Sequence, residues 1–183
     1  MTAIPTILDE KTKNNEGYAI VYFADSGFEL FTSNLDDIKL EVTLTNYPTL
    51  MGMMQNQSIE GLASSKINNN TFLFAYALNL KNLDAKDSRL KQNTVAIVNF
   101  IVSRENYKEL IVNFDDFEEF LETYFQPISF LGDLFTIDFT KIIPIFQERQ
   151  RIIEKTRNRK IRDKENSLAV EFNNWLKSAD LSE

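Results

Sequence analysis

Short apolar runs separated by polar turn residues follow one another over the first hundred residues of the chain. Residues 18–24 and 28–33 are rich in aromatic and β-branched side chains, and Asp25-Ser26-Gly27 between them is a typical turn sequence. The glycine can take a positive φ, as tight hairpin turns require. The pattern predicts a β-hairpin.

Three further strands are predicted, over residues 58–67, 71–80 and 94–103. An asparagine turn at 68–70 joins the first two, and the last two are among the most apolar runs in the chain. The run 94–103 is apolar on both faces, so we expect it at the centre of a sheet. Because the connections are short, the three strands predict an antiparallel meander.

The segment from 35 to 57 carries two conflicting patterns. Leu40, Val42 and Leu44 alternate as in a strand, whereas the later apolar residues suit a helical face. Proline is tolerated in the first turn of a helix but not in its interior. Pro48 therefore predicts a helix from about residue 48 to about 55, within a broken helical connection.

The period of the apolar residues changes at Arg104. From there to residue 125 they recur every three or four positions, with acidic residues on the opposite side, which predicts one amphipathic helix packed against the sheet. Gln126-Pro127 ends this helix. After a broken apolar stretch, residues 147–166 predict a highly charged helix.

This order, strand–strand–helix–strand–strand–strand–helix, predicts an α+β fold in which helices are layered on a five-stranded antiparallel sheet as a two-layer domain. The chain is divided into a flexible N-terminal arm (1–16), the α+β domain (17–133) and a basic, helical C-terminal extension (134–183).

Charge is distributed unevenly along the chain. The net charge is −7, but residues 141–164 hold nine basic and three acidic residues, so this segment carries +6 and the rest −13. An acidic body argues against nucleic-acid binding, and the basic segment lacks interleaved aromatic residues. Three interpretations of that segment stay open: a solvated helix, a peripheral contact with anionic membrane, or an arm that packs on a partner or on the body.

The chain contains no cysteine and no histidine. This excludes disulfides, thiolate and imidazole catalysis, and the commonest metal ligands. We predict no catalytic, cofactor-binding or metal-binding residues, although a carboxylate or lysine mechanism stays open. Acidic residues 9 and 10 interrupt any signal peptide, and no apolar run reaches the length of a membrane span. The expectation is a soluble cytoplasmic protein, with membrane contact only at its periphery.

The loop LKNLDAKDSRLKQN, residues 80–93, holds six charges between two apolar strands. It lacks the regular oxygen ligands and central glycine of a calcium loop, and it lacks the glycines of a phosphate cradle. We interpret it as a solvated connector. Arg89 and Lys91 are its candidates for contact with the acidic surface of a partner.

Two groups of apolar residues are further candidates for partner binding. The flexible side chains of Met51 and Met54 can fill the core or adapt to a partner. Phe172, Trp175 and Leu176 recur at helical spacing, and they either fold back on the body or dock in the groove of a partner or twin copy. The carboxylates of residues 115–122 are expected on a solvated helix face.

Residues 17 to about 125 resemble the longin domain, a member of the profilin-like group that also holds roadblock domains and, more distantly, the PAS and GAF folds. The resemblance is carried by AIVYFADSGFELFTS, a strand–turn–strand, and by the elements that flank LDAKDSRLKQ before an apolar strand. It implies a non-catalytic interaction module, because longin and roadblock domains bind small GTPases, membrane-trafficking components or one another, often as dimers.

The expected function is therefore that of an adaptor in small-GTPase regulation or membrane trafficking, with a small GTPase or another longin or roadblock domain as partner, and with a homodimer as a further option. The rival interpretation is a PAS- or GAF-like small-molecule sensor. Such a sensor needs a roomy apolar pocket inside the sheet, which the many phenylalanines of this chain could either line or fill.

Overall fold

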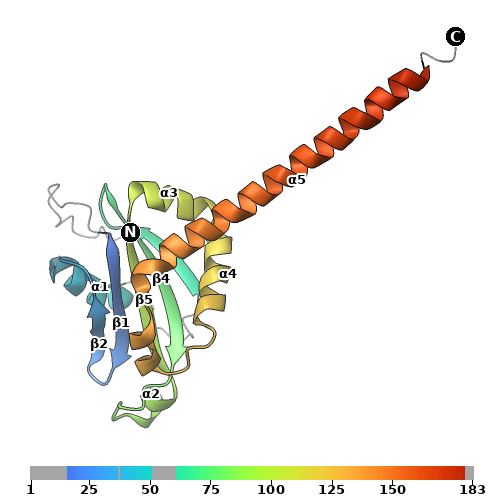
Figure 1. The fold of residues 1–183 in the computed structure, drawn as a ribbon. Coiled ribbons are helices and arrows are strands. Elements are labelled where there is room, and N and C mark those ends of the chain that lie inside the picture. Colours follow the sequence, from blue (N-terminus) through green and yellow to red (C-terminus); the bar gives the residue numbers. More distant parts are fainter. Residues whose placement is uncertain (1–15, 37, 51–60, 180–183) are drawn as a thin grey trace. The chain divides into compact units, whose positions relative to one another are not determined.

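A computed structural model describes residues 16–36, 38–50 and 61–179 of the chain, with only the backbone described at 38, 46–50 and 172–179. The chain divides into two compact units, Met1–Thr140 and Lys141–Glu183. In its described part, the first unit holds the sheet and four α-helices, and the described part of the second unit consists almost entirely of one long helix (Figure 1).

The sheet has five strands in the order β2-β1-β5-β4-β3, and every neighbouring pair is antiparallel. Its strands are β1 (Gly17–Ala24), β2 (Gly27–Ser33), β3 (Gly61–Lys66), β4 (Thr71–Leu80) and β5 (Thr94–Ser103) (Figure 1). The predicted hairpin, the predicted meander and the central place of the fifth strand are confirmed. The α+β class and the C-terminal helix are confirmed as well.

The helices of the first unit are α1 (Ile38–Leu50), α2 (Ser88–Gln92), α3 (Arg104–Val112) and α4 (Phe114–Phe125). Short 3-10 turns follow at Leu131–Thr136 and Phe139–Lys141. The helix of the second unit is α5 (Ile142–Ala179), and it runs without interruption through both the charged segment and the C-terminal apolar positions.

Helix α1 begins about ten residues before the predicted start, so the prediction from Pro48 was wrong in its position. The strand-like alternation was misleading, because Leu40 and Leu44 are buried one helical turn apart while Val42 between them is 56% exposed. The hydroxyls of Thr43 and Thr45 donate to carbonyls four residues earlier, within the helix. Pro48 lies in the last turn, so the backbone donor that proline lacks is missed only near the end of the helix.

Helices pack on both faces of the sheet, so the predicted two-layer arrangement was wrong. On one face Leu40 and Leu44 of α1 join a buried cluster with residues of the sheet. The sheet contributes small and branched side chains to it: Ala19, Val21, Leu73, Ala75, Ala77, Ile97 and Ile101. Three members of this set are alanines, so this face of the sheet carries smaller side chains than the aromatic face. The sequence did not predict this second helical layer, because the α1 segment combines strand-like alternation with helical spacing of its apolar residues.

The opposite face of the sheet is aromatic and is covered by α3 and α4. Phe72 stacks on Tyr107 of α3 with ring centroids 4.2 Å apart, and Phe74 meets Phe117 of α4 edge-on at 5.8 Å. Tyr76 stacks on Phe125 at the end of α4. Rings at these separations contribute about 0.5–1.5 kcal/mol per pair beyond the burial of their area. The predicted packing of aromatic rings against the sheet is confirmed.

The predicted single helix from 104 to 125 is two helices, α3 and α4, which meet at Asn113. Asn113 leaves the helical region with φ −109° and ψ 35°, and its side-chain amide donates to the carbonyl of Glu109 at 2.9 Å. A side chain that takes over a backbone acceptor is a common cause of a helix end. The apolar spacing continues across the break, so periodicity could not reveal it.

The start of β3 is fixed by a side chain from α4. The Glu118 carboxylate accepts a hydrogen bond from the Leu62 amide at 2.8 Å, across 56 residues of chain. Gly61 precedes that amide with φ +103°, and a Cβ on it would lie 2.8 Å from Glu118 Oε1. The glycine therefore allows both the backbone turn and the close approach of the carboxylate.

Replacing Gly61 with alanine should destabilise the first unit by about 1–3 kcal/mol, since a β-carbon is strained at this φ and displaces Glu118 from the Leu62 amide. The measurement is the midpoint of urea unfolding. Gly132→Ala is the matched control, because a β-carbon there would have no atom within 4 Å and the φ of Gly132 is not positive. Equal midpoints for the two variants would contradict the argument.

Candidate partner-binding surfaces

The loop between β4 and β5 is tied to the β1–β2 turn by Asp25. Its two carboxylate oxygens accept hydrogen bonds from the backbone amides of Lys86 at 3.1 Å and Asp87 at 3.0 Å. These two bonds hold the pKa of Asp25 below its usual value. Asp25 is thus more than a turn former: it fixes a loop that lies 61 residues away in the sequence.

Within this loop Asp87 caps the short helix α2, which the sequence did not predict. Its carboxylate accepts from the Arg89 amide at 2.8 Å, and the Arg89 guanidinium meets it through Nε and, at 2.7 Å, through Nη2. The side-chain hydrogen bonds from Arg89 lower the pKa of Asp87 to about 2. Arg89 is therefore engaged in its own loop, although 88% of its side chain stays exposed. Lys91, on the same helix, is exposed.

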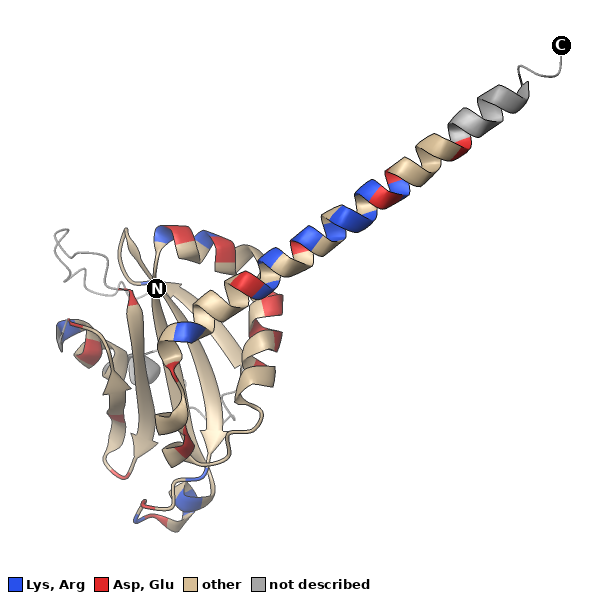
Figure 2. Ribbon diagram, in the orientation of Figure 1, with Lys and Arg blue, Asp and Glu red and all other residues tan. Residues whose placement is uncertain are grey.

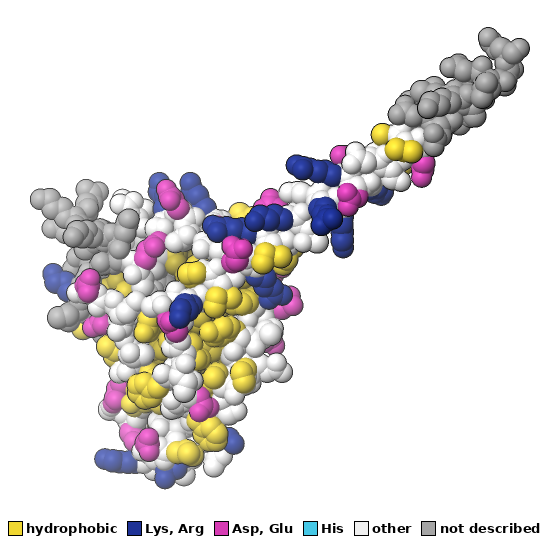
Figure 3. Space-filling model, viewed as in Figure 1, with side chains coloured by type: hydrophobic (Ala, Val, Ile, Leu, Met, Phe, Trp, Pro, Cys, Tyr) yellow, Lys and Arg dark blue, Asp and Glu magenta, His cyan; other side chains and the backbone are white. Residues whose placement is uncertain are grey.

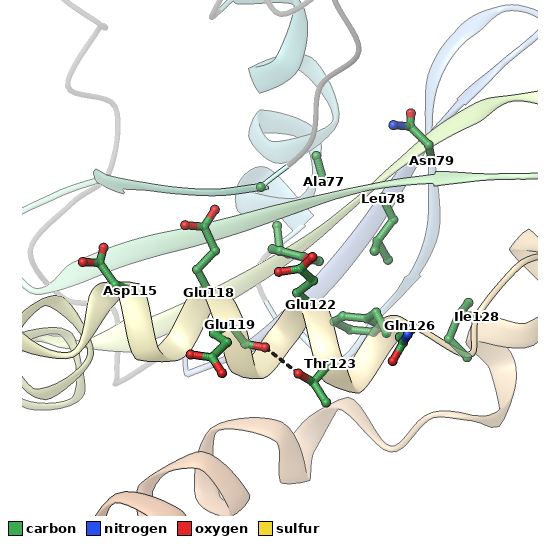
Figure 4. A pocket seen from close by; sticks show the side chains of 13 residues that line it. Ala77, Leu78, Asn79, Asp115, Glu118, Glu119, Glu122, Thr123, Gln126 and Ile128 are labelled. Carbon is green, nitrogen blue, oxygen red and sulfur yellow. Dashed lines mark hydrogen bonds between the residues drawn. The ribbon is translucent and has the colours of Figure 1, made fainter.

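An open groove of about 750 Å³ lies between β4 and α4 (Figure 4). Tyr76, Leu78, Phe125 and Ile128 supply its apolar lining. The described part of β3 pairs with β4 from Lys66, opposite Phe72, to Gly61, opposite Ala77, and both Gly61 and Ala77 line the groove. The segment after α4 runs beside the end of β4, where the Lys81 amide donates to the Ser129 carbonyl at 3.0 Å.

Acidic residues of α4 line the same groove. In Figure 4, Asp115, Glu118 and Glu122 point from α4 toward the strands, while Leu78 points back from β4. Asp115, Glu119 and Glu122 are exposed, as predicted for a solvated helix face, but Glu118 is half-buried because it binds the Leu62 amide. The surface therefore combines an apolar floor with an acidic wall, which suits a cationic, partly apolar partner.

No known protein family, curated protein or solved structure matches this chain. Its surfaces are therefore interpreted from their own chemistry.

The second unit carries half of the basic residues in less than a quarter of the chain, and many of them follow one another along α5 (Figure 2). Every residue of α5 from 151 to 171 is exposed. Apolar side chains appear between the charged ones along the helix (Figure 3): Ile152, Ile153, Ile161, Leu168 and Val170. A helix with charges on all sides and isolated apolar residues is suited to electrostatic contact rather than to a fully buried position.

The remaining predicted candidates are not brought together with these surfaces. Met51 and Met54 lie outside the described residues. Phe172, Trp175 and Leu176 lie in the last turns of α5, where only the backbone is described. Their roles in partner binding stay predictions.

Sequence reasoning missed the groove, because it depends on the register between β3 and β4 and on the packing of α4. It also missed the bond from Asp25 to the loop, which no local pattern signals. Among the described residues, no group of three acidic side chains is placed to hold a metal ion. None of the described helices combines the length and the apolar character needed to cross a bilayer.

Replacing Asp25 with asparagine should speed hydrogen exchange at the amides of Lys86 and Asp87, because the neutral amide offers one acceptor oxygen in place of two charged ones. Exchange followed by NMR is the measurement. Asp84→Asn changes the same charge in the same loop at an exposed position and serves as the control. Unchanged protection of both amides in Asp25→Asn would show that the carboxylate does not hold the loop.

The order of this loop should depend on pH only in strong acid. Asp25 and Asp87 have folded-state pKa values below the ordinary 3.8, so their ionised forms stabilise the folded loop. That stabilisation is complete above pH 3.8 and is lost as the pH falls through the folded pKa, about 2 for Asp87. Carboxyl chemical shifts followed over this range will test it, and a midpoint at the ordinary pKa would contradict it.

Proposed function

We propose that this chain is a non-catalytic protein-interaction module of the longin-like kind, acting as an adaptor in small-GTPase regulation or membrane trafficking. Its partner is a small GTPase or another longin or roadblock domain, and its place of action is the cytoplasm, with α5 available for peripheral contact with anionic membrane. One observation carries the proposal: the elements succeed one another in the order that supports the longin resemblance, with α2 as a short addition.

The surfaces of the first unit favour binding over chemistry. The groove beside α4 is lined by carboxylates on a helix face, and most of them are exposed. General acid catalysis by a carboxyl group is favoured at a buried position, and an exposed helix face does not supply that burial. An open groove with an apolar floor and a charged wall is the usual form of a peptide- or helix-binding surface.

The rival proposal of a PAS- or GAF-like sensor needs an enclosed apolar pocket. Between the sheet and the helices α3 and α4, the described rings are in direct contact: Phe100 with Phe117, and Phe117 with both Phe74 and Phe120. Rings packed in this way fill the space that a ligand would occupy. The groove itself is open and acidic. These features favour the adaptor.

The adaptor proposal is tested by binding titrations of the full chain against small GTPases in both nucleotide states and against longin and roadblock domains from the same cell. We expect saturable binding to at least one member of this panel. Titrations that show no binding to any member would refute the proposal.

Lys91→Glu should weaken that binding about two- to fivefold if α2 faces the acidic surface of the partner, because exposed ion pairs contribute about 0.2–1 kcal/mol. Lys108→Glu on α3 makes the same charge change at another exposed helix position and should have no effect. Arg89→Glu is a poorer probe, since it also removes the ion pair that caps α2. Equal affinities for the Lys91 and Lys108 variants would exclude α2 from the interface.

A further inference from the structure

Two helices of this chain carry opposite charges at the same spacing. On α4, Asp115, Glu119 and Glu122 form an acidic stripe with intervals of four and three residues. On α5, Lys155, Arg159 and Arg162 form a basic stripe with intervals of four and three residues. Residues so spaced lie on one side of a helix. All six side chains are exposed.

Neither stripe is used within the described structure. Among the described residues of the second unit, no ion pair joins Lys155, Arg159 or Arg162 to another residue of that unit. Among those of the first unit, the acidic stripe likewise has no basic partner in its own unit. Glu118 is not counted in the acidic stripe, because its carboxylate already accepts a hydrogen bond from the Leu62 amide at the start of β3. The two stripes are therefore available for an intermolecular contact.

Apolar residues give this contact a direction. Ile152 precedes Lys155 by three residues, lies on the same side of α5 and is 55% exposed. The apolar end of the groove, at Phe125 and Ile128, lies beyond Glu122 toward the C-terminal end of α4. An antiparallel arrangement places Ile152 at this apolar end, Lys155 near Glu122 and Arg162 near Asp115. It also sets the two helix dipoles in opposite directions, which is favourable.

We propose that the groove beside α4 binds the basic stripe of α5 from a second copy of this chain, in a reciprocal dimer with two equivalent contacts. Each copy then supplies one groove and one helix, so the assembly closes on itself as a two-fold dimer. The proposal does not depend on small-GTPase binding, because it uses a surface of α4 and not the α2 loop.

The lengths of the helices favour a second copy over the chain's own α5. Phe139 packs on Phe125 at the C-terminal end of α4, with ring centroids 6.2 Å apart, and α5 begins at Ile142. At 1.5 Å per residue, Ile152 lies about 15 Å into α5, and Asp115 lies about 15 Å from Phe125. A helix that ran back along its own α4 would thus carry the basic stripe past the acidic one. Bending α5 to correct this would break a helix that contains neither glycine nor proline after Pro144.

The test is a charge exchange in the full chain. One variant carries Glu119→Lys and Glu122→Lys, and the other carries Lys155→Glu and Arg159→Glu. Sedimentation equilibrium at low ionic strength, where screening is weak, should show a wild-type dimer whose dissociation constant rises with salt. Each variant should dimerise at least about tenfold more weakly than the wild type, because like charges then meet at both contacts.

Mixing the two variants shows whether α5 binds the groove of its own chain or the groove of a second copy. A mixture should form heterodimers with wild-type strength, since each groove then meets a helix of opposite charge, and a chain with all four substitutions should recover the homodimer. Arg157→Glu with Lys164→Glu is the control: it makes the same change in net charge on the other side of α5 and should preserve the dimer. Circular dichroism establishes that each variant is folded.

Several outcomes would overturn the proposal. A wild-type chain that stays monomeric at low ionic strength has no such dimer, and one that stays monomeric but sediments with anionic lipid vesicles uses the basic stripe for membrane contact instead. A dimer that is equally strong in both charge-reversed variants rests on another surface. Variants that fail to pair on mixing, while the fourfold variant behaves as wild type, would indicate that the contact forms within one chain.

Discussion

Burial of β5 on both faces is the constraint on which the first unit depends. This strand lies in the middle of the sheet, and its side chains from Ala96 to Val102 are all buried. A strand in that position requires a cover on each face, because an uncovered apolar face would meet water. Helix α1 supplies one cover over small residues, and α3 with α4 supplies the other over aromatic rings. The two covers therefore pack against different kinds of side chain, small and branched ones on one face and aromatic rings on the other.

Polar side chains complete this architecture by fixing the segments that the core does not reach. Asp25 binds two amides of the loop before β5, Glu118 binds the Leu62 amide at the start of β3, and Asp87 caps α2. In each case a carboxylate satisfies backbone donors that have no partner in a strand or a helix, which is the general requirement for an ordered connection. These contacts also determine the shape of the two candidate surfaces. Glu118 positions β3 beside the groove, and Asp25 positions the loop that carries Lys91.

Charge separation is the second organising feature of the chain. The acidic side of α4 stands beside an apolar floor, and the basic residues are concentrated on the exposed length of α5. Asp115 and Asp116 in the first turn of α4 also stabilise that helix through its dipole, so Asp115 serves the fold while it stays exposed beside the groove. A long exposed helix gains little from its own unit and is stabilised when it finds a surface of opposite charge.

The sequence by itself determined the elements whose residues agree with one periodicity: the hairpin, the meander, the central strand and the amphipathic character of residues 104–125. These features depend on local spacing and on turn residues, which are visible along the chain. Only the tertiary structure decided that α1 begins at Ile38, that helices cover both faces of the sheet and that Asn113 separates α3 from α4. The groove beside α4 and the contact from Asp25 belong to this second group too. All of these features arise where segments that are distant in the sequence meet. At such places the local sequence is compatible with more than one structure, and strand register and side-chain packing determine which one forms.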